Sequence, residues 1–382
     1  MPKRQRPKEI PDNAISTRDC RRAIKRITPA LYKGTRTTDV VVRVLTHFCF
    51  DGERAYAYDD VIAISTPLKT PFKGGLVGTV FGSLLDTARG DFVAIDVQDA
   101  SVKMECAGSI WTLPLMPTDD FLVQAPVVNK DELTVLDGPQ VVHLRNAFER
   151  CMLSVSPMNV NPVMRGITSR QIKNKQDVVV TAFWSTDGPS ISEYFTRNEM
   201  PDFFNDMCVP WQFAQVVTGL MTGDDDEGAA NFVGFKITED AIYAVVDETV
   251  VMAKRLDTSR DLPFQETMAD HRAKIKDSAP IPRLLKDALN NAAIVLESRD
   301  GSVCTLRVEG KLLSVQAGTP KEKGSVHEVG MELEGDHGDA EICCAPHLIQ
   351  RAIPYCTSIG FNSSGGTMSG KNFSVVIAGI GG

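Results

Sequence analysis

Residues 91–102 read DFVAIDVQDASV, and residues 231–243 read NFVGFKITEDAIY, a near copy in which Phe232 follows Phe92 by 140 positions. Each stretch alternates apolar and polar residues, turns at an acidic pair and then resumes the alternation. This pattern predicts a β-hairpin. Recurrence over such a distance indicates a repeated structural unit, and a repeat determines the architecture of the whole chain.

The segments around these hairpins repeat as well. A further strand is expected after each hairpin and an amphipathic helix before it, at 78–89 and 209–220. A fainter third copy has helical spacing at 345–356, followed at 360–380 by two expected strands around a Gly/Ser-rich turn. A second family of helices opens the three units, at 17–31, 140–155 and 281–296.

The predicted fold class is therefore α+β, with three repeated domains that each pack two helices on β-sheets. Polar, Pro-bearing connections place the boundaries at 1–125 (with a basic N-terminal arm), 126–269 and 270–382. Three like domains imply a curved or closed array rather than one catalytic cleft. In this scheme Asp59 and Asp60, in the stretch CFDGERAYAYDDVIAIST (49–66), are turn residues between strands and need no catalytic partner.

Composition narrows the function classes. A chain of 382 residues with 43% hydrophobic and 24% charged residues suits a folded protein of two or three domains. No apolar run approaches the length of a membrane span, and the basic start is not followed by the apolar stretch of a secretory signal. The nine cysteines are scattered without a CxxC pair, which is typical of reduced thiols in the core of a cytosolic protein.

Motifs for catalysis and metal binding are weak. GGTMSGKN (365–372) nearly spells a phosphate loop, but Asn372 stands where Ser or Thr would hold magnesium, so a hairpin turn is expected. GDDDEG (223–228) lacks calcium-loop spacing, and the six histidines form no zinc-binding pattern. We therefore expect no catalytic residues, no metal site and no cofactor, and the protein is not expected to be an enzyme.

Positive charge is concentrated at the start of an acidic chain. Residues 1–36 hold eleven Lys or Arg against three acids, a local charge of +8, which leaves −16 for the other 346 residues. In the first helix an apolar stripe should face a sheet, and it consists of Cys20, Ile24, Ile27 and Leu31. The remaining surface is basic and predicts sequence-independent contact with nucleic-acid phosphates. Its residues are Arg18, Arg21, Arg22, Lys25 and Arg26.

Taken together, these segments resemble the bacterial DNA sliding clamp, the β subunit family of DNA polymerase III, in a divergent and phage-like form. The resemblance covers about residues 15–380. It rests on FDGERAYAYDDVIAI (50–64), TDG (186–188), LMPTDDF (115–121) and the last unit, and on their order and threefold recurrence rather than on any one motif.

The resemblance implies a head-to-tail homodimer that closes into a ring of six domains, with sheets outside and helices around duplex DNA. It implies a DNA polymerase and a clamp loader as partners, no membrane association, and a cytoplasmic location at the replication fork, or in the host cytoplasm if a phage encodes the chain. Lys33 and Arg36 match a DNA-contacting loop of the family.

The family's partner groove lies between the second and third domains and takes short apolar motifs such as QLxLF. Two departures are visible here: Pro189 and Ser190 replace a His-Arg pair, and the chain ends in IAGIGG rather than the family's Met-Pro-Met-Arg-Leu pattern. The matched groove positions are Met164, Thr186, Gly188, Pro189, Ser190, Ile191, Pro263, Met268, Val375, Val376 and Ile377.

Two other functions stay open from sequence alone. One is a DNA-binding or interaction module of the same fold that acts in replication or repair but does not slide. The other is an enzyme with a hidden site, which the missing nucleophile, metal and phosphate motifs disfavour.

Overall fold

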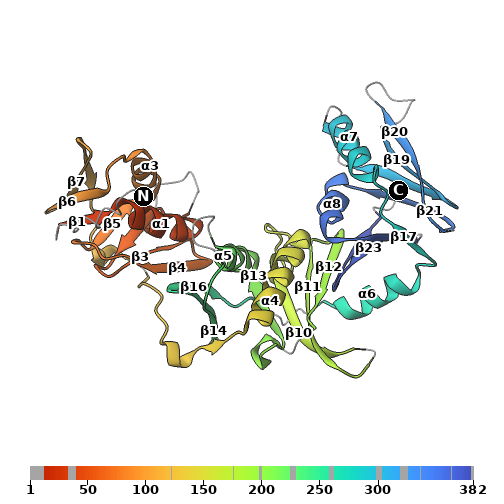
Figure 1. Cartoon of the computed structure of the whole chain (residues 1–382), viewed down its shortest axis with the longest axis horizontal. Coiled ribbons are helices and arrows are strands. Elements are labelled where there is room, and N and C mark those ends of the chain that lie inside the picture. The colour runs from red at the N-terminus through yellow and green to blue at the C-terminus, as the bar shows by residue number, and fades with distance from the viewer. Residues whose placement is uncertain are drawn as a thin grey trace, which may run out of the picture. The chain divides into compact units, whose positions relative to one another are not determined.

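The computed structural model describes residues 13–32, 40–121, 123–174, 176–197, 200–223, 229–257, 262–297, 303–318, 326–335, 337–362 and 364–379. The chain forms two compact units (Figure 1). One combines Met1–Leu136 with Val216–Lys254, and the other combines Asp137–Gln215 with Arg255–Gly382. Within the described residues, each unit contains one four-stranded and one eight-stranded antiparallel sheet together with its helices.

Helices α1 and α4 begin at side-chain caps. The Ser16 hydroxyl accepts the Asp19 N–H at 3.2 Å ahead of α1, and Asp137 and Gln140 form a reciprocal capping box at the start of α4. The described helices are α1 (Thr17–Ile27), α2 (Val40–Leu45), α3 (Gly78–Thr87), α4 (Gly138–Cys151), α5 (Trp211–Thr222), α6 (Phe264–Ala273), α7 (Leu285–Glu297) and α8 (Pro346–Gln350).

The first unit contains both predicted hairpins, β6–β7 and β14–β15, which are confirmed. Its smaller sheet has the order β1 (Ala14–Ser16), β6 (Phe92–Gln98), β7 (Ser101–Cys106), β8 (Ser109–Pro114). Its larger sheet has the order β5 (Gly74–Val77), β2 (His47–Phe50), β3 (Arg54–Tyr58), β4 (Ile62–Pro67), β16 (Thr249–Lys254), β15 (Ala241–Val246), β14 (Val233–Ile237), β9 (Thr134–Val135).

The second unit repeats this plan. Its larger sheet has the order β13 (Met207–Pro210), β10 (Gly166–Lys173), β11 (Val179–Thr186), β12 (Ser190–Phe195), β24 (Phe373–Ala378), β23 (Gly365–Gly370), β22 (Ser358–Asn362), β17 (Ser278–Pro280). Its smaller sheet has the order β20 (His327–Glu332), β19 (Leu312–Ala317), β18 (Cys304–Glu309), β21 (Asp339–Cys344).

Each large sheet joins strands from different thirds of the chain. In the first unit β4 pairs with β16, with Ile64 opposite Val251, and in the second β12 pairs with β24, with Ile191 opposite Val376. The middle third therefore gives β9 and β14–β16 to one sheet and β10–β13 to the other, and the division between the units falls inside α5. Continuous backbone hydrogen bonding defines the compact units, and the three-domain division of the sequence stays a prediction.

Apolar helix faces cover the sheets. The stripe predicted for α1 is buried, with Ile27 fully inaccessible, and Figure 1 shows α1 beside β3 and β4. In the second unit Phe148 of α4 meets Phe183 of β11 edge-on, with ring centroids 6.3 Å apart. All nine cysteines are free and eight are buried, which confirms their interpretation as core residues.

Asp59 and Asp60 form the turn between β3 and β4, as predicted. One Asp59 carboxylate oxygen accepts the N–H groups of Val61 and Ile62 at 3.0 and 2.9 Å. Asp60 has a φ of 79°, a left-handed conformation that Asp tolerates better than most residues. The pair closes a hairpin.

Two expectations near the C-terminus were wrong in detail. The helix expected over 345–356 stops at Gln350, because Pro354 has no N–H to continue it, and a short 3₁₀ turn follows at Ile353–Tyr355. The segment expected as a hairpin turn, 365–372, is mostly strand β23. The turn itself is only Lys371 and Asn372, and Asn372 has a φ of 61°.

Candidate functional site

Arg21 and Arg26 of α1 make hydrogen bonds to other elements of the first unit. The Arg21 guanidinium donates from Nε to the Leu85 carbonyl at 2.8 Å and also to the Ala88 carbonyl, so it caps the C-terminus of α3. Arg26 donates from Nη1 to the Thr249 hydroxyl of β16 at 3.3 Å. Both side chains therefore help to hold the first unit together.

The other three basic residues form one stripe along α1. Arg18, Arg22 and Lys25 follow an i, i+4, i+7 spacing on the side opposite the buried residues, and Arg18 and Lys25 are exposed. This stripe is the part of the predicted phosphate-contacting surface that the structure presents outward. Lys33 and Arg36 lie outside the described residues.

Strand β12 has two faces with different neighbours. On one face the Ser190 and Ser192 hydroxyls each lie 2.8 Å from the Ser154 hydroxyl, and Tyr194 lies 2.9 Å from His143 of α4. We call this the α4 face. On the other face Ile191 packs against the cluster that contains Phe264, the first residue of α6, and we call this the α6 face.

The predicted groove residues divide between these faces. Thr186 lies opposite Ile191, and Val376 lies opposite Ile191 on the other side, so all three belong to the α6 face. Met164 lies beside Gly188 in the turn before β12, since its Cε would be 3.6 Å from a Cβ added there. Pro263 is exposed at the start of α6, and Met268 is fully buried within it.

Three of the matched residues lie on the α4 face instead: Ser190, Val375 and Ile377. Val375 and Ile377 are register partners of Ser192 and Ser190, and each is 2% exposed. Ile377 lines a small internal cavity with residues such as Leu306 and Met368. Pro189 is exposed and its carbonyl accepts the Ala378 N–H at 2.8 Å. Strict alternation along β24 could have separated Val376 from its two neighbours.

A pocket of about 260 Å³ that the sequence did not predict opens on the α6 face. The Trp184 and Phe264 rings stack in it, 6.1 Å apart and 3° from parallel. The Thr168 hydroxyl that lines it is buried and has no hydrogen-bond partner among the described residues. Pro263 belongs to both this pocket and the predicted groove. The full lining is Thr168, Arg170, Trp184, Leu262, Pro263, Phe264, Gln265 and Glu266.

A buried ion pair attaches α6 to this face. The Glu193 carboxylate is 2% exposed, accepts the Trp184 indole N–H at 2.9 Å and pairs with Arg272 of α6. Burial lowers the pKa of Arg272. The pair fixes one wall of the pocket, because Glu193, Trp184 and α6 are linked through a single carboxylate.

Among the strands that end a sheet, β8 and β20 have contrasting side chains. Strand β8 ends its sheet in the first unit, has no charged residue, and leaves Ile110 57% exposed. Strand β20 ends its sheet in the second unit and carries two exposed acids, Glu328 and Glu332. An uncharged edge strand is a ready template for pairing with another chain.

The described part of the chain contains no group of three or more His, Cys, Asp or Glu placed to hold a metal ion. None of its helices is long and apolar enough to cross a membrane.

Solved structures share this arrangement almost from end to end. The sliding clamp of Pseudomonas aeruginosa DNA polymerase matches with a TM-score of 0.73 at 14% identity, over 96% of this chain and 99% of that one. The DNA polymerase III β subunit of Thermotoga maritima matches with a TM-score of 0.75 at 13% identity, over 96% of this chain and 98% of that one. The Bartonella birtlesii clamp bound to griselimycin matches with a TM-score of 0.77 at 12% identity, over 97% of this chain and 99% of that one.

The chain has the fold of the bacterial sliding clamps. No family model and no curated protein matches the sequence itself. The likeness thus lies in the path of the backbone, and the clamp fold is confirmed although few residues are shared.

The ion pair gives a direct test of the α6 attachment. We expect Arg272→Ala to lower the free energy of unfolding by roughly 2–3 kcal/mol, less than the 3–5 typical of a fully buried pair, since Arg272 is 38% exposed. The combined change Arg272→Met and Glu193→Gln should recover most of this loss, because it removes the unpaired charge and keeps an acceptor for Trp184. Urea unfolding measures both. Equal losses in the single and double variants would contradict a role for this charge pair.

Proposed function

We propose that this chain is a sliding clamp, a processivity factor that encircles duplex DNA as a homodimer and tethers a DNA polymerase. The clamp fold supports this proposal, and so does the pattern of strand pairing within the chain. No chemistry is needed for such a task, so the protein acts without being an enzyme. The clamp loader and polymerase are the partners that the fold implies.

The pairing pattern carries the proposal for a ring. Strands β4, β12 and β20 hold the same place in the three repeats, as do β8, β16 and β24. Within the chain β4 pairs with β16 and β12 pairs with β24. This leaves β20 and β8 without their equivalent partners, and a second copy of the chain supplies both. Head-to-tail pairing of β20 with β8 twice closes a dimer with two like interfaces.

Charge supports DNA as the encircled ligand. The α1 stripe of Arg18, Arg22 and Lys25 concentrates positive charge on one helix of a chain whose net charge is −8. Contacts of this kind hold phosphates without reading bases, which suits a ring that must move along DNA.

The α6 face supports a peptide-binding role. Ile191 of the predicted groove packs against the cluster of Trp184 and Phe264, and the pocket beside them is lined by apolar and polar side chains together. Two apolar side chains buried there gain about 3–6 kcal/mol before ordering costs, which suits exchangeable binding by more than one partner.

Retention on circular DNA tests the proposed function. With a loader present, the protein should stay on a nicked circle through gel filtration and leave once the circle is cut, because closed rings slide off free ends. Release from circles and linear DNA at the same rate would show a binding module that does not slide. The variant Arg18→Ala/Arg22→Ala/Lys25→Ala should flatten the slope of log K against log salt by about 2–3, at about 0.9 per contact.

Subunit closure has its own test. Light scattering should give a mass about twice the 41.7 kDa of one chain. Ile110→Asp should shift the protein to monomer, because a carboxylate on β8 would face Glu328 and Glu332 of a partner's β20. Ile110→Lys should dissociate less, since its charge is attracted there. A wild-type protein that is monomeric at micromolar concentration would rule out the proposed ring.

Peptide binding tests the α6 face separately. A labelled QLxLF peptide should bind with micromolar affinity, and Met164→Lys or Ile191→Asp should weaken it at least tenfold, measured by fluorescence anisotropy on variants with unchanged melting points. Ile110→Asp is the matched control and should bind as wild type does. Equal binding by all four proteins would place the partner site elsewhere.

A further inference from the structure

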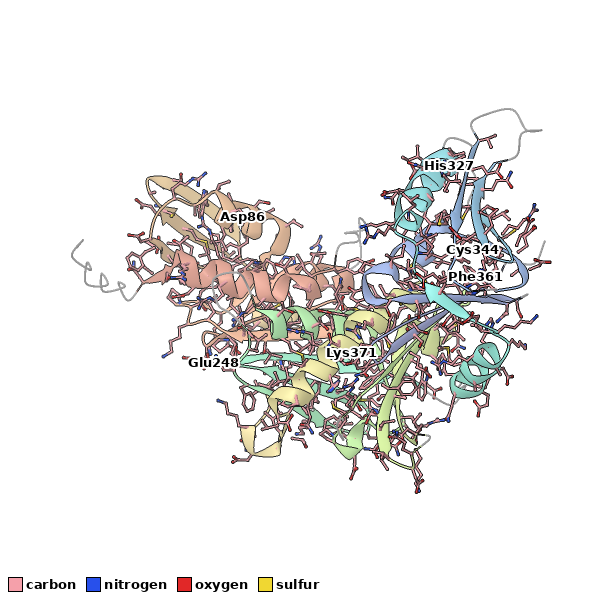
Figure 2. The ribbon with its side chains drawn as sticks, turned by 45° about the vertical axis from the view of Figure 1, so that its right-hand side comes forward. Asp86, Glu248, His327, Cys344, Phe361 and Lys371 are labelled. Carbon is pink, nitrogen blue, oxygen red and sulfur yellow. The ribbon has the colours of Figure 1, made fainter. Side chains whose placement is uncertain are left out.

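The turn between β23 and β24 gathers basic side chains from three segments of the second unit. Lys371 lies on the turn itself, beside helix α4, and is labelled in Figure 2. Arg150 of α4 donates from Nη1 to the Lys371 carbonyl at 2.9 Å, and Arg197, just after β12, donates from Nε to the Asn372 amide oxygen at 3.1 Å. The Asn372 carbonyl also accepts the Phe195 N–H at 2.9 Å. Two arginines thus fix the turn that displays Lys371.

Aromatic rings hold the Arg150 guanidinium in place. It lies over the rings of Tyr194, Tyr355 and Phe373, at 5.1, 5.7 and 5.9 Å from their centroids. The Tyr194 hydroxyl lies 2.9 Å from Nδ1 of His143, which adds a fourth basic group to the same place. A cation held over three rings is preorganised, so little ordering remains when a ligand arrives.

Within the described residues this cluster has no acidic partner. No carboxylate there lies within salt-bridge distance of His143, Arg150, Arg197 or Lys371. Other arginines of the unit do pair with acids, such as Arg351 with Asp187 at 2.7 Å and Arg307 with Glu341 at 2.8 Å. The pKa of His143 is lowered by burial and then by Arg197, Arg150 and Lys371. The described side chains of the cluster therefore concentrate positive charge.

The side chains suit one ligand chemistry. A planar guanidinium, an ammonium and an imidazole converge from the α4 face, and Arg197 and Lys371 are exposed. Phosphate oxygens match these donors in charge and in hydrogen-bonding capacity. In the first unit the stripe of α1 is likewise borne by the helix that opens its repeat.

We propose that His143, Arg150, Arg197 and Lys371 form a second phosphate-binding site, which takes the backbone of duplex DNA at the α4 face. Arg197 and Lys371 contact phosphate oxygens, and Arg150 acts chiefly as a positioning residue for the turn. The inference rests on the proposed function for its ligand. The cluster itself was not predicted, because its members lie up to 228 positions apart in the sequence.

Salt dependence of DNA binding tests the site in the full-length protein. A labelled 30-base-pair duplex is titrated by anisotropy over a range of salt concentrations. Arg197→Ala/Lys371→Ala should flatten the slope of log K against log salt by about 1.8, two contacts at about 0.9 each. Lys173→Ala/Lys311→Ala removes the same charge from exposed positions of the same unit and should leave the slope unchanged. The proposal is overturned if Arg197→Ala/Lys371→Ala leaves the slope unchanged, or if both double variants change the slope equally.

Histidine NMR identifies the ligand. The pKa of His143 should rise when duplex DNA binds, because phosphate charge offsets the neighbouring cations, and it should rise less in Arg197→Ala/Lys371→Ala. A rise with inorganic phosphate alone and none with DNA would show a free-anion site, and a larger rise with an oligoglutamate peptide would show a protein ligand. Either result overturns the assignment to DNA.

These outcomes separate the two proposals. If the wild-type protein leaves circular DNA freely, and Arg197→Ala/Lys371→Ala flattens the slope of log K against log salt, the protein has the phosphate site but is not a sliding clamp. If the wild-type protein stays on circular DNA, and the same double variant leaves that slope unchanged, the protein is a clamp without this site.

Discussion

Backbone hydrogen bonds between β4 and β16 and between β12 and β24 join the repeats of this chain into continuous sheets. Each junction is a run of main-chain pairs between residues about 185 positions apart. Main-chain pairing demands extended backbone and apolar packing on the faces but few particular side chains. This explains how the clamp fold persists here at 12–17% identity to known clamps.

The same junctions give one strand two tasks. Alternate residues of β12 point to opposite faces, so Tyr194 helps to hold the basic cluster beside α4 while Glu193 anchors α6. Neither role can shift along the strand without moving the other. The register of β12 against β24 therefore couples the α4 face to the α6 face through backbone geometry alone.

Local patterns in the sequence predicted most of the elements but not their side-chain partners. The hairpins at 92–106 and 233–246, the α1 stripe and the turn at Asp59 follow from alternation, helical spacing and turn chemistry. That Arg21 caps α3 depends on tertiary placement that spacing does not encode. The groove was matched by position, and matching ignored the alternation that turns Val375 and Ile377 away from Val376. The Trp184 pocket and the Lys371 cluster had no local signal, because each joins distant segments.

The interleaving of the thirds also imposes an order on synthesis. The large sheet of the first unit is incomplete until β16, which ends at Lys254, has left the ribosome, and one edge of β12 has no partner until β24, about 180 residues further along the chain, has been made. Pairing over such sequence separations is slow and leaves strand edges exposed in the meantime. A chain that is cut before Phe373 would leave this edge of β12 unpaired, so the large sheet of the second unit forms as a whole only when β24 is present.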